Sequence, residues 1–437
     1  MDFTGVTFDG PINFARSQFG TARFTGATFK GPVTFERAEF LGEAWLDSVT
    51  FEGTASFRGA TFHRRAVFEY LEKPGDLGPE ARGWPEEVTF RRWADFRGIV
   101  CHGSARFGGA QFEGRARFNG AQFQSPAGVS FEGAAFAHSR TLGHVDVAGP
   151  LKLDKAVFEA PIRVRAAAKT ILCDRTQFQR MTTIDIWRGD IFLKEASFAE
   201  PSIVSATSDA NPMPKLLSLQ RANVAQLTVS GLDLRECSFL DVHNLDGLRI
   251  EGGSELDVMK GRMPRRVICD ETSFRKDPKR DPVQAERIAR AYRSLRKGRE
   301  DSKDAPGAAD FYYGEMEMRR KGAQRFDSVV LPAYWLTSGY ALEAWRAVVA
   351  LILTVVVIAA GLALGGFDPK PGFDPELDFW DSLLYSAEST TSLFRAPSPP
   401  EGAELTYLGH VLQMVLRLLG PLFFGLALLA LRGRVKR

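Results

Sequence analysis

Three polar side chains stand at helical spacing inside an otherwise apolar segment, residues 405–431. His410, Gln413 and Arg417 occupy positions i, i+3 and i+7, and Pro421 follows on the same face. An arginine near the middle of a bilayer costs at least about 2.5 kcal/mol on insertion scales, so this polar stripe is expected to face protein or water instead of lipid. Two helices alone hide such a stripe poorly. The pattern therefore predicts oligomerisation through membrane helices.

A second group of polar residues precedes that segment, on a stretch with the apolar spacing of one helical face, "FWDSLLYSAESTT". We predict a helix over 378–392 that re-enters the membrane. The candidate residues on it and just after it are Glu388, Thr390, Thr391 and Arg395. Glu388 is then the expected partner of Arg417. The alternative is that Arg417 extends to the bilayer surface and binds lipid phosphate.

Two apolar segments must position these residues. Residues 347–367 carry no formal charge, and residues 405–431 are interrupted by Arg417 alone. A helix of about 20 apolar residues crosses the ~30 Å hydrocarbon layer. We therefore predict a two-helix transmembrane domain, with the lipid bilayer as its partner.

The distribution of lysine and arginine predicts the orientation of these helices. Basic residues cluster before the first segment and after the second, in the tail 432–437, whereas the connecting residues 368–404 hold two basic and eight acidic side chains. Loops rich in lysine and arginine stay on the cytoplasmic side. We expect both termini in the cytoplasm and an acidic extracytoplasmic loop. We therefore predict a multi-pass protein of the cell membrane, which we expect to be a bacterial plasma membrane.

The order of helix, short helix ending in threonines, and helix resembles the pore module of two-transmembrane potassium channels. "FWDSLLYSAESTT" looks like their pore helix. A potassium filter needs glycines that aim backbone carbonyls inward. Leu393, Phe394 and Arg395 stand where the resemblance would place those glycines. The resemblance thus implies a channel-like topology without a potassium-selective filter. A chance similarity of a short aromatic helix is the alternative.

Residues 275–325 form a basic block with 15 Lys/Arg against 9 Asp/Glu. Asp281 as N-cap and Gly298 as stop delimit one amphipathic helix, and "GAADFYYGEMEMRRKG" indicates a second. The two predict a cytoplasmic helical hairpin. Glu315 and Glu317 on the second helix are interpreted as solvated helix charges.

Residues 326–346 are predicted to form a segment at the membrane interface. Aromatic side chains concentrate at this depth because their rings are apolar and their polar groups reach water. The expected aromatic belt consists of Tyr334, Trp335, Tyr340 and Trp345.

The N-terminal part of the chain repeats a large aromatic residue every five or six positions, with a small residue two places before it. Ala22 precedes Phe24, and Ala27 precedes Phe29. A spacing of two puts both side chains on one face of extended chain. The pattern resembles the pentapeptide-repeat family, whose fold is a right-handed quadrilateral β-helix with four repeats per coil. The resemblance is clear over 1–136 and weaker to 274, with loop insertions near 71–87 and 208–215.

Four cysteines fall into the same inward positions of the repeat. They are Cys101, Cys173, Cys237 and Cys269. No CxxC or Cys/His spacing indicates a metal site. We interpret the thiols as small buried side chains and expect no cofactor.

Enzyme and nucleic-acid functions are disfavoured by what the sequence lacks. No Walker loop, GxSxG or HExxH motif is present, so the protein is not expected to be an enzyme. Some members of the family imitate DNA with an acidic rod. Residues 1–274 instead balance 33 Lys/Arg against 34 Asp/Glu, and no nucleic-acid partner is expected. Two functions remain: an oligomeric ion-channel-like assembly with the β-helix as its sensor or gate, and, as the alternative, a membrane-anchored scaffold whose β-helix binds a protein partner.

Overall fold

The chain divides into two units, each with its own core. The computed structural model describes residues 1–69, 87–260, 264–277, 279, 281–370, 378–391 and 397–435. The first unit comprises Met1–Arg280 with Arg290–Asp304, and the second comprises Asp281–Ala289 with Ala305–Arg437. The loop predicted near 71–87 falls almost wholly outside the described residues.

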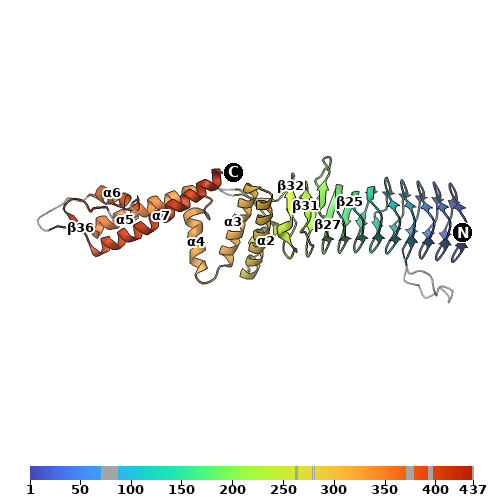
Figure 1. Cartoon of the computed structure of the whole chain (residues 1–437), viewed down its shortest axis with the longest axis horizontal. Coiled ribbons are helices and arrows are strands. Elements are labelled where there is room, and N and C mark those ends of the chain that lie inside the picture. Colours follow the sequence, from blue (N-terminus) through green and yellow to red (C-terminus); the bar gives the residue numbers. More distant parts are fainter. Residues whose placement is uncertain are drawn as a thin grey trace. The chain divides into compact units, whose positions relative to one another are not determined.

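The first unit begins as a parallel β-solenoid of about 10 turns (Figure 1, blue to green). One strand stack contains β1 (Thr7–Phe8), β5 (Thr28–Phe29), β9 (Thr50–Phe51), β13 (Thr89–Phe90), β17 (Gln111–Phe112), β21 (Ala135–Phe136), β24 (Val157–Phe158), β26 (Gln177–Phe178) and β28 (Ser197–Phe198). The next stack contains β2 (Ile12–Asn13), β6 (Val33–Thr34), β10 (Ala55–Ser56), β14 (Ala94–Asp95) and β18 (Ala116–Arg117).

Two further stacks complete each coil. One contains β3 (Gln18–Phe19), β7 (Glu39–Phe40), β11 (Thr61–Phe62), β15 (Val100–Cys101) and β19 (Gln122–Phe123). The other contains β4 (Ala22–Arg23), β8 (Ala44–Trp45), β12 (Ala66–Val67), β16 (Ala105–Arg106), β20 (Val129–Ser130) and β23 (Pro150–Lys152). Side chains that bond between neighbouring coils, such as Thr25 with Asp47 and Arg180 with Glu200, are 22 and 20 residues apart, and Arg91 and Glu52 are 39 apart because a loop is inserted between them.

Phenylalanine ladders fill the solenoid because equal positions of successive coils lie above one another. Phe8, Phe29 and Phe51 begin a ladder that continues to Phe198 with ring centroids 4.7–5.2 Å apart. This spacing matches the distance between paired strands. Cys101 takes a ladder position between Phe62 and Phe123, which confirms the inward position predicted for it.

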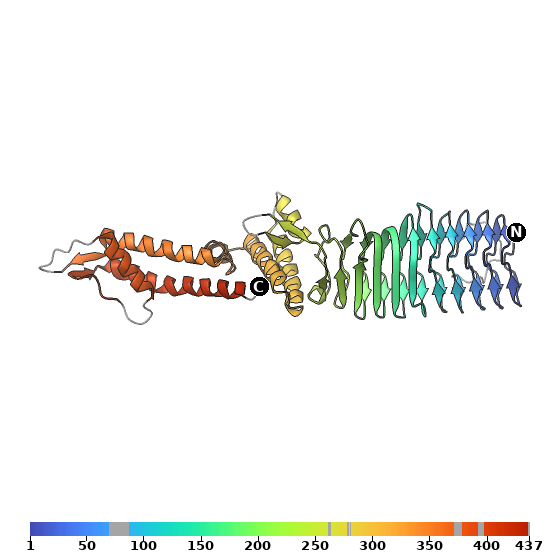
Figure 2. The same cartoon turned by 90° about the horizontal axis from the view of Figure 1, so that it is seen from above.

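The later coils replace corners by long strands, which Figure 2 shows in green. β22 (Thr141–Val147) leads to β25 (Ile162–Leu172) and β27 (Thr182–Phe192), in which apolar and polar residues alternate. The last coils hold β29 (Ser202–Ala206), β30 (Leu216–Ser218), β31 (Leu227–Ser230), the 3-10 turn η2 (Leu245–Gly247) and β32 (Arg249–Glu251). Turns and bends occupy the loop predicted at 208–215.

The solenoid ends earlier than the repeat predicted. Parallel pairing stops at β32 and at the bridge to Glu255. The antiparallel pair β33 (Asp257–Met259) and β34 (Arg265–Val267) follows, and then helix α1 (Cys269–Lys276). Cys269 and Phe274, which were expected in coil positions, lie on α1, because the last "small residue, then Phe" spacing belongs to a helix.

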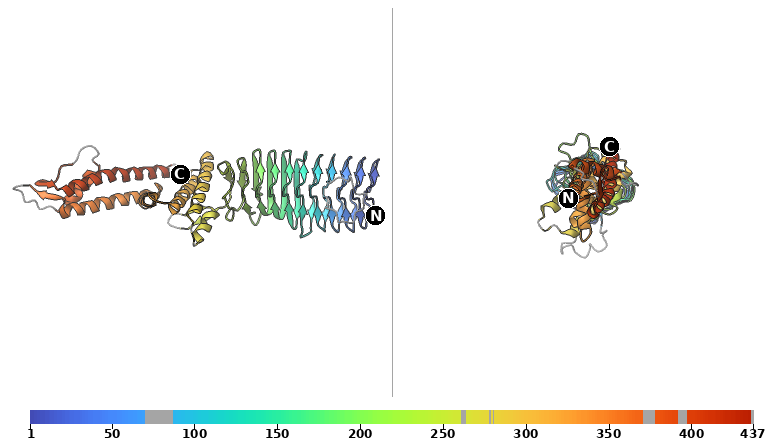
Figure 3. Two further views of the ribbon diagram at one scale, coloured as in Figure 1. Left: turned by 90° about the horizontal axis from the view of Figure 1, so that it is seen from below. Right: turned by 90° about the vertical axis from the view of Figure 1, so that its left-hand side faces the viewer.

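The helices that follow agree with the predicted order. α2 (Pro282–Asp301) continues past Gly298, and α3 (Ala305–Gly322) returns beside its first turns, where Gly322 approaches Ala285. α4 (Asp327–Ser338) precedes α5 (Ala344–Gly365). α6 (Phe379–Thr391) and α7 (Tyr407–Val435) complete the second unit (Figure 3, left).

A short antiparallel pair joins the facing ends of α5 and α7. β35 (Phe367–Pro369) pairs with β36 (Ala403–Leu405), and Thr406 Oγ1 donates a hydrogen bond to the Gly365 carbonyl at 2.9 Å. The segment that contains α6 therefore begins and ends at this strand pair.

Candidate functional site

The two apolar helices pack with α6 into one cluster, which we call the membrane hairpin (α5, α6 and α7). Tyr385 of α6 packs against Ile358 and Leu362 of α5 and Leu416 of α7. Its ring also lies edge-on to Phe367, with centroids 5.5 Å apart. The short helix is thus part of the core of the hairpin.

The predicted polar stripe does not form a single surface. Gln413 is 7% exposed and donates a hydrogen bond from Nε2 to the Tyr385 hydroxyl at 2.6 Å. His410 is exposed, and Arg417 is half-buried. The middle residue of the stripe is therefore satisfied within the chain by α6, which reduces the part of the stripe left to face another subunit.

Glycines allow close approach between the elements of the hairpin. A Cβ at Gly420 would lie 2.7 Å from Thr390 Cγ2 and 3.1 Å from the Thr390 carbonyl oxygen. A Cβ at Gly409 would meet the Gly366 carbonyl. Contacts of Tyr385 with Gln413 and of Thr390 with Gly420 show that α6 runs in the same direction as α7, ending beside the middle of the apolar span Tyr407–Leu431.

α6 has a polar buried face and an apolar exposed face. Three serines at helical spacing are buried, Ser382, Ser386 and Ser389. Phe379, Trp380 and Leu384 are exposed, as is Glu388. The predicted apolar face exists, but it points away from the cluster. Arg395 and the side chain of Thr391 lie outside the described residues.

Much apolar surface of α5 and α7 is left uncovered by the chain itself. In the most apolar 18-residue stretch of each helix, only 22% of α5 and 28% of α7 is buried. Both helices are long and apolar enough to span a membrane. A large exposed apolar surface of this kind indicates contact with lipid or with other subunits.

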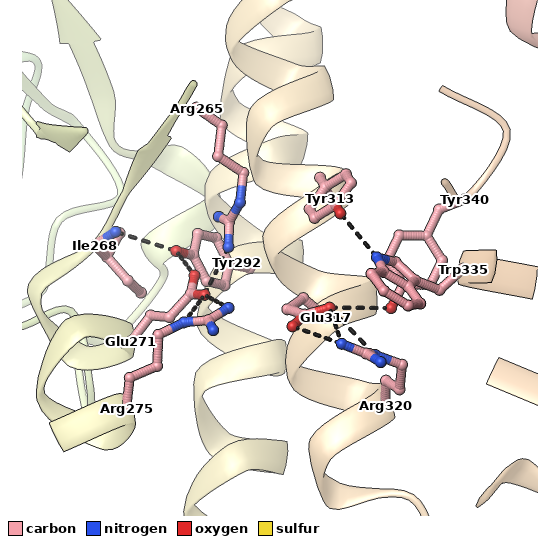
Figure 4. A network of polar contacts seen from close by, with 10 residues as sticks. All are labelled: Arg265, Ile268, Glu271, Arg275, Tyr292, Tyr313, Glu317, Arg320, Trp335 and Tyr340. Carbon is pink, nitrogen blue, oxygen red and sulfur yellow. Dashed lines mark hydrogen bonds and ion pairs between the residues drawn. The ribbon is translucent and has the colours of Figure 1, made fainter. Parts of the chain in front are cut away.

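The segment before α5 is a packed junction of polar and aromatic side chains, which we call the Glu317 junction (Figure 4). Glu317 is 5% exposed and accepts hydrogen bonds from Arg320 at 2.9 and 3.0 Å and from the Tyr340 hydroxyl at 3.2 Å. Glu315, 2% exposed, pairs with Arg319 at 2.7 Å. The interpretation of both glutamates as solvated charges is therefore wrong, because both are buried, and Tyr340 of the turn after α4 covers Glu317.

Trp335 of α4 lies between two arginines of the same junction. The guanidinium carbons of Arg320 and Arg346 are 4.4 and 5.1 Å from its ring centroid, within the range of cation–π attraction. Its indole N–H donates to the Tyr313 hydroxyl at 3.0 Å. Trp335 and the fully buried Tyr340 thus pack in the junction, whereas Trp345 is exposed, and the aromatic belt stays a prediction.

The turn from α4 to α5 is left-handed over three consecutive residues. Gly339, Tyr340 and Ala341 have φ values of 55°, 62° and 59°. A residue with a Cβ pays about 1–2 kcal/mol in this conformation. The buried Tyr340 ring and its bond to Glu317 hold the strained turn in place.

A second buried glutamate, Glu271, lies in the first unit; we call its surroundings the Glu271 clasp (Figure 4). Its carboxylate meets Arg265 and Arg275 at 2.6 Å each. The Tyr292 hydroxyl donates to Glu271 Oε2 at 2.6 Å and accepts from the Ile268 amide at 3.1 Å. The clasp connects β34, α1 and α2 just beyond the last coil.

Burial keeps both tyrosines of these networks protonated. Desolvation and the neighbouring Glu271 raise the pKa of Tyr292 far above its usual value, and desolvation and Glu317 do the same to the pKa of Tyr340. Each phenol is therefore a permanent hydrogen-bond donor to its carboxylate.

Neither network was found from the sequence, although one signal was present. Each buried glutamate has an arginine three or four residues later on its helix, Arg320 after Glu317 and Arg275 after Glu271. This spacing is also common on solvated helices. The tyrosines that distinguish the two cases lie more than 20 residues further along the chain.

Three of the four thiols are buried as expected, whereas Cys269 on α1 is only partly buried, so the burial predicted for it was wrong. Cys101, Cys173 and Cys237 are fully buried, and burial raises their pKa. Among the described residues, no group of three or more His, Cys, Asp or Glu side chains could hold a metal ion.

The N-terminal coils match one protein family. Its model, described as pentapeptide repeats (9 copies), matches residues 2–39, 35–70 and 86–128. No curated protein and no solved structure matches the chain. None of these results covers the membrane hairpin, so the resemblance to a potassium-channel pore module stays an expectation. The chain carries pentapeptide repeats in its N-terminal region, followed by a helical region with two helices apolar enough to span a membrane.

Proposed function

We propose that copies of the chain assemble through the membrane hairpin into an ion-channel-like pore without a potassium-selective filter, with the β-solenoid as its sensing or gating domain. The observation that carries this proposal is the place of α6. It packs against both apolar helices and ends beside Gly420, in the middle of the span Tyr407–Leu431. If α7 crosses the bilayer, α6 re-enters it and ends near its centre.

The end of a helix inside a membrane needs special surroundings. The last four carbonyls of a helix have no partner within it, and they carry the negative end of the helix dipole. Such backbone is tolerated at membrane depth only where it is buried in protein or lines a water-filled cavity. A cavity shared between several hairpins satisfies this requirement and favours cations.

Two further observations support an assembly that attracts cations. The exposed face of α6 is apolar, with Phe379, Trp380 and Leu384, which suits packing against a second hairpin. The segment 368–404 has eight acidic and two basic residues, and a charge of this sign concentrates cations at a pore mouth.

Current recording on the full-length protein in planar bilayers tests the proposal, with Gly420→Ala as the main variant. A methyl group there would collide with Thr390, so α6 must shift and the single-channel conductance should fall. Gly425→Ala is the matched control, because it changes the same residue type on the same helix and a Cβ there meets no atom within 4 Å.

Two results would contradict the pore. One is the absence of current from a preparation that crosslinking shows to be oligomeric. The other is a strict monomer in membranes, because a single hairpin cannot enclose a cavity at the end of α6.

The alternative function, a membrane-anchored scaffold, is favoured by a different observation. The solenoid exposes Trp93 among arginines that have no acidic partner in the described part of the chain. In that case the membrane hairpin anchors the protein and the surface of the solenoid binds a protein partner.

A further inference from the structure

One region of the solenoid surface differs from the rest in shape and charge. We call it the Trp93 face, and it consists of Arg92, Trp93, Arg115, Arg117 and Arg140. β14 and β18 pair with Ala94 opposite Ala116, so Trp93 lies beside Arg115 on the next coil. The Ala116 amide donates to Ser139 Oγ at 3.0 Å, which places Ser139 and the next residue, Arg140, on the following coil beside β18. Three successive coils thus contribute to the face.

Trp93 is not needed to build the coil. It is 42% exposed. Because Ala55 pairs with Ala94, the residue at the equivalent position of the preceding coil is Thr54, which has a much smaller side chain. The Arg117 guanidinium carbon lies 4.4 Å from the Trp93 ring centroid. This contact orients the indole on the surface without covering it.

The positive charges of the Trp93 face are only partly compensated, because Asp95 stands opposite Arg117 but forms its ion pair with Arg97. Nearby arginines have partners: Arg97 pairs with Asp95 at 2.6 Å, and Arg163 with Asp185 at 2.8 Å. Within the described ranges, none of the four arginines of the Trp93 face has a carboxylate within 4.0 Å. The face therefore has a positive potential on a solenoid whose total charge is close to zero.

We propose that the Trp93 face binds an acidic segment of a partner protein. Tryptophan and arginine are the residues most often found at the energetic centre of protein interfaces. Charge complementarity specifies a partner rich in Asp and Glu. A nucleic acid fits less well, because a phosphate backbone needs an extended basic surface, and residues 1–274 balance 33 Lys/Arg against 34 Asp/Glu. The proposal holds whether or not the membrane hairpin conducts.

The test uses the full-length protein in detergent micelles. An array of short synthetic peptides displays segments with several Asp and Glu around one apolar residue, each beside a copy in which Asn and Gln replace the acids. We expect retention of the acidic peptides only. The best of them, labelled with fluorescein, then gives an affinity by anisotropy, and Trp93→Ala should weaken it about tenfold or more.

Charge reversal separates this face from general attraction. The double variant Arg115→Glu, Arg140→Glu should abolish retention. Arg23→Glu on β4 is the matched control, since Arg23 is an exposed arginine of another strand stack and should leave retention unchanged. Arg115→Gln with Arg140→Gln, a milder pair, repeats the measurement if the reversed variant loses the circular dichroism spectrum of the folded protein.

Three results would overturn the proposal. Acidic peptides could be retained no better than their amide copies, or equally well by the charge-reversed variant. A DNA duplex added in solution could bind more tightly than the peptide through the same arginines, which would assign the face to nucleic acid.

Discussion

The Glu271 clasp and the Glu317 junction use the same chemistry in two regions of the molecule. Each buries a glutamate and satisfies it with arginine and a tyrosine hydroxyl. Glu271 is completely buried and meets two arginines, and its tyrosine is itself held by the Ile268 amide. Glu317 meets Arg320, and its tyrosine belongs to a left-handed turn.

The two networks differ in whether the backbone segments that they hold together are strained. In the clasp, the polar contacts join β34, α1 and α2, and no described residue of these elements has a positive φ. The network therefore closes the end of the solenoid firmly. In the junction, the contact between Glu317 and Tyr340 opposes the cost of a turn placed directly before α5. Similar buried ion pairs can therefore stabilise an unstrained connection in one region and a strained turn in another.

The largest effect should come from Glu271→Gln. Removing one charge of a buried network leaves the others unpaired and costs about 3–5 kcal/mol. Hydrogen exchange of the amides in α1 and α2, measured in the full-length protein, should show this loss of local stability. Glu251→Gln on the exposed side of β32 is the control. Equal exchange protection in the Glu271→Gln and Glu251→Gln variants would show that the Glu271 clasp does not stabilise α1 and α2.

A matched pair of tyrosine variants measures the two networks against each other. Tyr292→Phe leaves both Glu271 Oε2 and the Ile268 amide without the phenol and should cost about 3 kcal/mol, whereas Tyr340→Phe removes a single 3.2 Å bond and should cost about 1 kcal/mol. Exchange protection of α1 and of α3 gives the two values. A larger loss at Tyr340 would mean that the junction, and not the clasp, is the firmer connection.

The smallest effect is expected for Ala341→Gly. Glycine removes the Cβ cost of the left-handed conformation, about 1 kcal/mol, and loses about as much through the entropy of the unfolded chain. The exchange protection of the first turn of α5 should therefore change by less than about 0.5 kcal/mol. A clear destabilisation would show that the Ala341 methyl group packs in the junction and that strain is not what distinguishes it.

The sequence predicted those features of the structure that depend on residues close together in the chain, and missed those that depend on distant partners. The inward position of Phe29 follows from a spacing of two residues and that of Cys101 from its place five residues after Phe96, so a local pattern was sufficient. The position predicted for Cys269 was wrong, because its spacing of five residues before Phe274 falls on helix α1. The burial of Glu317 depends on Tyr340, and that of Gln413 on Tyr385, partners 23 and 28 residues away that no periodicity connects.

The pairing of β35 with β36 has a mechanical consequence. It fastens the Gly365 end of α5 to the Tyr407 end of α7, and the Thr406 bond and the close approach of Gly409 to Gly366 reinforce that point. Two rods joined at one end can only swing about the joint. Any relative displacement of α5 and α7 must therefore be smallest at this end and grow with distance along the helices. A tilt of about 5° becomes a separation of about 2–3 Å at the far ends, about 30 Å away.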